Sequence, residues 1–397
     1  MNRTKPFSFY APTRIEYGIG KVDGQLKDEV KGLGGKKLLI VTDKGIVKAG
    51  ILEKVEKQLK ENNLEFEVFS EVESNPRDTT VGKIADIAKK NKVDVLIAVG
   101  GGSSMDAAKA AGLLVTNGGQ IHDYFGLDMV KKRALPLITI PTTAGTGSEV
   151  TFWSVIDDTR KTMHVKESIG SALICPTVAL VDPLMTVSLP PHLTAYTGMD
   201  ALSHAVEGYF AVPAEPITDS LCLTAIQLIT SNLAPAVLNG DNLEARDSML
   251  LGSVIAGIAF FNSDVTIDHC LGEAIGGFND THHGLLMGIL LPYVMDYNLA
   301  TNPKKFAEIA KAMGENIDGL TLREAARKSI DAVVNLSRAI GMPILKDLNI
   351  KEQDFRVISE MAMKNVSVNS NPRKASIKDF EKILQDAYND KFKITAK

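Results

Sequence analysis

Four residues in the second half of the chain have the types and the spacing of a metal site. Asp200 and His204 lie four residues apart, so on a helix both side chains project from the same face. His269 and His283 follow, 14 residues apart. One carboxylate and three imidazoles, without a thiolate, form a donor set suited to Fe(II) or Zn(II). Such a metal acts as a Lewis acid on a carbonyl or alkoxide oxygen.

The spacing leaves parts of this site open. His282 directly precedes His283 and competes with it for the same role. Glu207, three residues after His204, is either a fourth ligand or a partner that orients a ligand. The remaining histidines show no partner pattern and are interpreted as structural or surface residues: His122, His164 and His192.

A glycine-rich turn in the first half has the composition of a phosphate-binding loop. The strand-like run 93–99 leads into five small residues: Gly100, Gly101, Gly102, Ser103 and Ser104. Glycines let the backbone approach a pyrophosphate, and the start of the following helix offers N–H groups and the positive end of its dipole. We expect the two serines to cap this helix and to bond phosphate oxygens.

A second loop of similar character follows the next strand. The strand-like run 135–140 leads into Pro141–Glu149, which is rich in glycine and hydroxyl residues. Two such loops at the carboxyl ends of parallel strands build a crevice where ligands bind. Asp43 ends an earlier strand, where a carboxylate would accept bonds from a ribose and favour NAD over NADP. The alternative for Asp43 is a residue that only caps or turns.

The elements that must hold these loops alternate along the first half. Strand-like runs at 37–42, 66–69, 93–99 and 135–140 are separated by helix-like segments at 50–62, 81–92 and 105–114. This alternation predicts a mostly parallel sheet covered by helices on both faces. Because neither loop has the GxGxxG or the Walker A pattern, we expect a Rossmann-like variant of the dinucleotide-binding fold.

The predicted secondary structure changes after Pro190-Pro191, beyond which almost no segment has the pattern of a strand. Helices are expected at 194–209, 219–233, 243–260, 303–312, 322–341, 353–366 and 376–388. We therefore expect an α/β domain over residues 1–187 and an all-helical metal-binding domain over residues 188–397.

The composition excludes several classes of partner. The chain has 397 residues and a net charge of −4, which argues against a nucleic-acid surface. No uninterrupted apolar run of about 18 residues predicts a membrane span, and no apolar segment near the start resembles a signal peptide. Three cysteines without a CxxC pair fit a reduced, cytoplasmic compartment: Cys175, Cys222 and Cys270.

Several motifs occur in order along the chain: Gly100–Lys109, Pro141–Glu149, Gly198–Glu207, His269, His283–Pro292 and Asn371-Pro372-Arg373. Together they resemble the iron-containing (group III) alcohol dehydrogenase family over nearly the whole chain. The resemblance implies a nucleotide-binding α/β domain and a helical metal domain with the active site between them. It implies iron held by Asp200, His204, His269 and His283, and so chooses His283 over His282.

The resemblance also implies NAD as the hydride carrier. It places the pyrophosphate on Gly101, Gly102 and Ser103, and Asp43 matches the position that favours NAD. Three further residues are implied near the nicotinamide ribose or the phosphates: Thr142, Thr143 and Lys166. Phe260 matches a position that lines the substrate pocket, and Phe152 is a second candidate for that pocket.

One position departs from the family pattern. Many relatives carry a second histidine four residues after the first downstream ligand, with a suggested role in moving protons, and here that position is Glu273. A carboxylate one helical turn from His269 could relay protons, and it should disfavour anionic substrates. Alternatively, Glu273 pairs with a nearby cation and does neither.

The resulting hypothesis is a metal-dependent oxidoreductase that moves hydride between NAD(H) and a small neutral alcohol and its aldehyde or ketone. The alternatives are a zinc polyol dehydrogenase, a synthase that cycles NAD internally, and a non-catalytic metal- and nucleotide-binding structural protein. We expect a homodimer, in which the apolar residues 7–10 form an edge strand across the two-fold axis. No nucleic-acid or membrane partner is expected.

Overall fold

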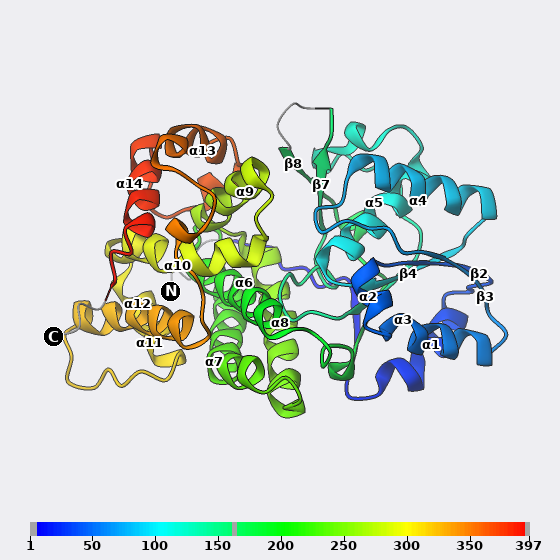
Figure 1. Cartoon of the computed structure of the whole chain (residues 1–397), viewed down its shortest axis with the longest axis horizontal. Helices are drawn as coiled ribbons and strands as arrows, with labels where there is room; N and C mark the ends of the chain where they lie inside the picture. Colours follow the sequence, from blue (N-terminus) through cyan, green and yellow to red (C-terminus); the bar gives the residue numbers. More distant parts are fainter. Residues whose placement is uncertain (1–5, 161–164, 394–397) are drawn as a thin grey trace. The chain divides into compact units, whose positions relative to one another are not determined.

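The computed structural model describes residues 6–160 and 165–393, which form two compact units (Figure 1). One unit comprises residues 11–189, and the other comprises residues 190–393 together with residues 6–10. This division differs from the expected one at the start of the chain, because residues 6–10 belong with the helical unit. His164 lies outside the described residues.

The first unit is built on a six-stranded sheet in the order β1-β9-β6-β4-β2-β3, with every pair parallel. Its strands are β1 (Arg14–Tyr17), β2 (Lys37–Val41), β3 (Glu65–Phe69), β4 (Val95–Gly100), β6 (Leu137–Pro141) and β9 (Val178–Val181). The α/β expectation with a parallel sheet is therefore confirmed. The crossover helices are α1 (Lys21–Gly32), α3 (Ile51–Glu61), α4 (Asp78–Asn91) and α5 (Gly102–Asn117).

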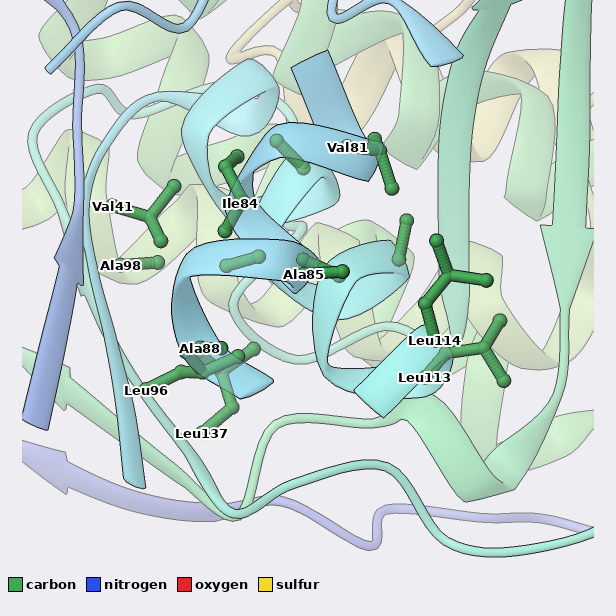
Figure 2. Close-up of a cluster of buried hydrophobic side chains, with 14 of the residues drawn as sticks. Val41, Val81, Ile84, Ala85, Ala88, Leu96, Ala98, Leu113, Leu114 and Leu137 are labelled. Atoms are coloured by element: carbon green, nitrogen blue, oxygen red, sulfur yellow. The ribbon is translucent and has the colours of Figure 1, made fainter. Parts of the chain in front are cut away.

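The central strands β2 and β4 are buried on both faces and supply side chains to two separate cores. Val41, Leu96 and Ala98 face α4 and α5, where they contact residues such as Ile84 and Ala85 (Figure 2). The alternate positions of the same strands pack with α1 and α3 on the opposite face. This explains why these strands read as continuous apolar runs rather than as alternating ones.

A second, three-stranded sheet in this unit was not expected from the sequence. It has the order β5-β8-β7, with β5 (Gly126–Leu127), β7 (Trp153–Asp158) and β8 (Val165–Gly170). The long pair β7–β8 is antiparallel. The short helix α2 (Lys44–Lys48) follows β2 directly.

The edge strand expected over residues 7–10 would pair with a second copy of the chain, so the structure of one chain does not test it. These residues have no regular structure, and the first strand begins at Arg14. The backbone of Tyr10 is instead held by one side chain of the helical unit, since its N–H donates to Asn262 at 2.7 Å and its carbonyl accepts from the same amide at 2.9 Å.

The helical unit contains α6 (Pro191–Phe210), α7 (Pro216–Leu238), α8 (Leu243–Ser263), α9 (Ile267–Asn279), α10 (His283–Asn298), α11 (Pro303–Ala312), α12 (Leu322–Ala339), α13 (Phe355–Ala362) and α14 (Ile377–Tyr388). Helices α6, α7 and α8 pack against one another. The helix expected over 353–366 is shorter, because 3₁₀ turns flank α13 on both sides. Helix α10 was not expected, and α9 was expected only as the helical turn from His269 to Glu273.

Helix α7 is long and apolar enough to cross a membrane by length and composition, with a mean hydropathy of 1.6 over its most apolar window. Between its two ends, four exposed positions nevertheless recur at helical spacing and are polar: Ser220, Thr224, Gln227 and Ser231. The opposite face packs on α6 and α8. One buried and one polar face are typical of a helix at the edge of a protein core.

Candidate metal centre and cofactor-binding loops

Three of the four predicted metal ligands converge within the helical unit. One ligand atom from each of Asp200, His269 and His283 lies within 4.8 Å of the other two. Asp200 Oδ1 is 3.5 Å from His283 Nε2 and 3.9 Å from His269 Nε2. The Nε2 atom of His269 is buried and makes no hydrogen bond to any described residue. A nitrogen and oxygen donor set around a buried, unsatisfied nitrogen fits a divalent cation.

The fourth predicted ligand, His204, lies against the ring of His269. Its ring centroid is 4.6 Å from that of His269, and its other neighbour is Phe260, stacked at 4.1 Å with an interplanar angle of 11°. His204 and Asp200 are one turn apart on α6, as the spacing predicts. The Phe260 ring therefore packs against one face of the His204 imidazole.

Glycines in α10 bring His283 close to Asp200. A Cβ atom on Gly284 would lie 2.5 Å from the carbonyl oxygen of Tyr196 and 3.3 Å from Asp200 Cβ. Only a residue without a side chain lets the start of α10 lie so close to α6. The two adjacent histidines have different neighbours. The ring of His282 contacts Tyr196, whereas His283 faces Asp200.

Glu207 is a hydrogen-bond partner of a ligand residue. Its carboxylate contacts Nδ1 of His269, and Oε1 also accepts the N–H groups of Thr266 at 2.9 Å and Asp268 at 3.1 Å. Glu207 is fully buried. Because Nδ1 is engaged, Nε2 is the nitrogen that this ring presents to a metal.

Electrostatics around His269 favour a cation. Burial opposes the imidazolium form, but the carboxylates of Glu207, Asp200 and Asp268 outweigh it and raise the pKa of His269 to about 9. A divalent cation bound at Nε2 would replace that proton, so metal loading should release protons near neutral pH.

Two carboxylates beside the cluster complete its surroundings. Asp268 is fully buried, and its burial together with the Glu207 charge raises its pKa well above the usual range. Glu273 lies one turn after His269 on α9 and accepts a hydrogen bond of 2.6 Å from the Asn365 amide. Asp268 and Asn365 were missed by the sequence reasoning. A carboxylate next to a ligand histidine was a usable signal for Asp268, whereas Asn365 is 92 residues from its partner.

The glycine-rich turn lies in the first unit, where β4 ends and α5 begins. Gly100 has a φ of 152°, and Gly101 is the N-cap of α5. A Cβ atom on Gly102 would lie 2.8 Å from Cγ2 of Thr146 in the second loop. The two predicted loops are therefore in direct contact, and the start of α5 forms a narrow backbone cradle that a Cβ atom would fill. Such a cradle fits a pyrophosphate.

The serines of this turn do not cap α5 as expected. The Ser103 hydroxyl donates to the carbonyl oxygen of Ser74, and the Ser104 hydroxyl is 3.4 Å from Asp43 Oδ2. Asp43 itself caps α2, because its Oδ1 accepts the N–H groups of Gly45 and Ile46 at 2.7 and 3.0 Å. Asp43 thus stands beside the glycine turn while it also has the capping role that we considered as its alternative.

The other predicted cofactor residues occupy three places in the first unit. The N–H of Thr142 donates to the Gly100 carbonyl at 3.0 Å, and Thr143 would contact a Cβ atom on Gly101 at 3.3 Å. Lys166 lies on β8, opposite Asp157. Phe152 precedes β7 and its ring contacts Trp153 at 4.7 Å. The roles of all four residues near the nicotinamide, the phosphates or the substrate stay predictions.

Among the described residues, two histidines outside the metal cluster have local partners. His122 Nε2 is 2.7 Å from Asp78 Oδ2, and His192 contacts the ring of Tyr196. Asp158 is 3.7 Å from the same His122 nitrogen and is held by the Arg160 guanidinium, whose hydrogen bonds lower the pKa of Asp158 to about 2. One ligand atom from each of Asp78, His122 and Asp158 lies within 4.8 Å of the other two, so the structural interpretation of His122 stays a prediction.

Comparison with known proteins gives matches over both units. Residues 12–183 match the family model for iron-containing alcohol dehydrogenase, and residues 194–388 match the C-terminal model of the same family. The 1,3-propanediol dehydrogenase of Citrobacter freundii is 43% identical over 96% of this chain and 99% of its own length. The NAD-dependent methanol dehydrogenase of Bacillus methanolicus is 39% identical, covering 96% of this chain and 99% of that protein.

A solved structure agrees with this match. The crystal structure of a 1,3-propanediol oxidoreductase superposes with a TM-score of 0.94 at 41% identity, covering 96% of this chain and 100% of that one. The chain belongs to the iron-containing alcohol dehydrogenase family. It is an oxidoreductase that transfers hydride between NAD(H) and an alcohol–aldehyde pair.

Proposed function

We propose that Asp200, His204, His269 and His283 hold one iron(II) ion in an enzyme for small neutral alcohols and their aldehydes or ketones. The observation that carries the proposal is the convergence of Asp200, His269 and His283, with Glu207 fixing the His269 ring. The family name and the donor set support iron, and the same donors also suit zinc. A zinc polyol dehydrogenase is the competing assignment.

A bound divalent metal supplies Lewis acidity toward the substrate oxygen, and NAD(H) accepts or supplies hydride. The chain itself contributes orientation. Glu207 holds the His269 ring in the tautomer that leaves Nε2 for the metal, and Phe260 fixes the plane of His204 by stacking. The start of α5, with Gly101 and Gly102, offers backbone N–H groups to the pyrophosphate.

Proton movement is assigned to Glu273. It lies one helical turn from His269 and is partly exposed, so its carboxylate can exchange a proton with water. The Asn365 amide donates to one oxygen and thereby orients the carboxyl group. In this proposal Glu273 receives the proton released when an alcohol is oxidised.

The substrate class follows the relatives. The names of two of them specify 1,3-propanediol and methanol, which are small and uncharged. A cytoplasmic homodimer is a further part of the proposal. The three buried free cysteines fit a reducing compartment, and two-fold dimers are the commonest soluble oligomers.

Metal analysis tests the assignment. Protein purified anaerobically without chelators should contain about one iron per chain, and His204→Ala and His283→Ala should lose both the metal and NADH-dependent carbonyl reduction. His282→Ala is the matched control, since it removes the neighbouring imidazole and should keep both. The assignment is wrong if the first two variants retain full metal content and activity. Zinc in place of iron would favour the polyol dehydrogenase.

A further inference from the structure

Glu273 is fixed by a short segment far along the chain. Asn365 donates from Nδ2 to Glu273 Oε2 at 2.6 Å, and its Oδ1 accepts the N–H of Ser367 at 3.0 Å. Both ends of the Asn365 amide are therefore engaged, which fixes the direction of the hydrogen bond. A neutral amide donor orients a carboxylate without cancelling its charge.

The segment that carries Asn365 is itself anchored. It continues into the 3₁₀ turn η7 (Val366–Ser370), whose Ser367 and Ser370 hydroxyls both donate to the carboxylate of Asp264. The carbonyl of Ser370 accepts the Val212 N–H at 2.9 Å. Asp264 ends α8, directly before the turn into α9. The anchors of η7 thus lie beside the helix that carries His269 and Glu273.

Negative charge is concentrated in this part of the helical unit. Five carboxylates surround the start of α9: Asp200, Glu207, Asp264, Asp268 and Glu273. The charges of Glu207, Asp200 and Asp268 act on His269, and those of Glu273, Glu207 and Asp264 act on Cys270. Of the five, Glu207 and Asp200 contact ligand histidines, and Asp268 is fully buried. Asp264 and Glu273 are both partly exposed, but each oxygen of Asp264 accepts a serine hydroxyl of η7. Glu273 is therefore the carboxylate of this group best placed to meet a solute.

We propose that Glu273, oriented by Asn365, is a specificity-determining residue that excludes negatively charged alcohols and aldehydes and so restricts the enzyme to neutral or cationic ones. The inference rests on the proposed metal centre. Side chains one helical turn apart have Cβ atoms about 5–6 Å apart, so a substrate beside His269 lies within reach of the Glu273 charge. At the intermediate dielectric of a partly buried site, such a like charge should lower the binding of an anion at least about tenfold.

Two alcohols of nearly the same shape test the exclusion. 3-Hydroxypropanamide and 3-hydroxypropanoate differ in charge, and their oxidation is followed as NADH formation at saturating NAD. The wild-type enzyme should prefer the amide by at least about tenfold in kcat/KM. Glu273→Gln should reduce this preference about tenfold by lowering KM for the anion, while loss of the proton acceptor lowers kcat for both alcohols alike. Glu244→Gln makes the same charge change near the start of α8, about 30 Å along that helix from the end that leads into α9, and should leave the ratio unchanged.

Anion binding without turnover gives a second readout. The visible absorption of cobalt(II)-loaded protein is titrated with propanoate and with propanamide, which have no hydroxyl group to oxidise. Glu273→Gln should bind propanoate about tenfold more tightly and propanamide unchanged. Asn365→Ala removes the donor but keeps the charge, and should give an intermediate ratio. If Asn365→Ala behaved as wild type, the positioning role of Asn365 would be excluded.

The outcomes separate this inference from the proposed function. Equal use of the amide and the carboxylate by the wild type, or an unchanged ratio in Glu273→Gln, overturns the exclusion while leaving the dehydrogenase assignment intact. Failure of the wild type with 1,3-propanediol, the amide and a panel of neutral alcohols would instead contradict the proposed function. In that case the cobalt titration still decides whether Glu273 repels anions.

Discussion

The fully buried carboxylate of Glu207 contacts Nδ1 of His269 and, through Oε1, also accepts two backbone N–H groups at the start of α9. The Glu207 side chain on α6 therefore fixes both the N-terminus of α9 and the orientation of the His269 ring on that helix. Since the carboxylate is held by several donors, the ring orientation is present before any metal binds.

Glu207→Gln should weaken metal binding. The amide is nearly isosteric but removes the negative charge behind the imidazole, and loss of such a partner typically costs about 10- to 100-fold in metal affinity. Competition with a chromogenic chelator measures the affinity, and circular dichroism confirms that the helical unit is folded. A variant that holds its metal as tightly as the wild type would show that the contact has no influence on the centre.

Gly102→Ala should impair NAD binding. Its Cβ atom would lie 2.8 and 2.9 Å from the Thr146 side chain, so the two loops must separate. Overpacking of this kind costs about 1–3 kcal/mol, and the moved N–H groups should raise the Kd for NADH about tenfold or more. Fluorescence titration with NADH measures this.

Gly82→Ala is the control for that substitution. Gly82 lies inside α4, and apart from its own helix backbone and chain neighbours no heavy atom lies within 4 Å of the point that an alanine Cβ would occupy. Alanine has the higher helix propensity there, so NADH binding should be unchanged and stability equal or slightly greater. Normal NADH binding by Gly102→Ala would show that the cradle does not hold the cofactor.

Asn371→Ala should destabilise the helical unit. The amides of Asn298 and Asn371 exchange two hydrogen bonds, at 2.9 and 3.0 Å, and both residues are buried. Truncating one partner leaves the other unsatisfied, which costs about 1–3 kcal/mol. Thermal unfolding should show this loss of stability. The double variant Asn298→Ala, Asn371→Ala should lose less stability than the two single variants together. Strict additivity would mean that the pair is not coupled.

Glu149→Gln should change how stability depends on pH. Burial raises the pKa of Glu149 from 4.5 to about 7, so the folded protein binds a proton there that the unfolded chain has lost. The contribution of Glu149 to the free energy of unfolding is therefore largest below pH 4.5. It falls by up to about 3 kcal/mol as the pH rises toward 7. Relative to the wild type, Glu149→Gln should gain Tm between about pH 5 and pH 8. Parallel Tm curves for the two proteins would contradict the shifted pKa.

The fold of the first unit was largely predictable because its strands are buried on both faces. Runs such as 37–41 and 95–99 are apolar and β-branched, and they appear as β2 and β4. Strand β7 was missed because Trp153–Asp158, with the sequence WSVIDD, forms neither a continuous apolar run nor a regular alternation of apolar and polar residues. Helix α10 and most of α9 were missed because their glycines lower helix propensity, although Gly272 and Gly284 are what permit close packing.

The candidate site was likewise predictable only in part from the sequence. Asp200 and His204 share a helix face, so their spacing was informative. His282 and His283 could not be told apart by spacing, since the choice depends on how α10 lies against α6. The contact of Asn365 with Glu273 joins residues 92 positions apart and left no local pattern.

The anchoring of Tyr10 on Asn262 imposes an order on biosynthesis. Residues 11–189 form one continuous unit, and its last sheet strand ends at Val181, so the nucleotide-binding half can fold while the rest of the chain is still being made. Tyr10 precedes this unit and leaves the ribosome first, but its partner emerges 252 residues later. The earliest described residues of the protein must therefore wait for most of the chain, and they dock on the helical unit as a late step of folding.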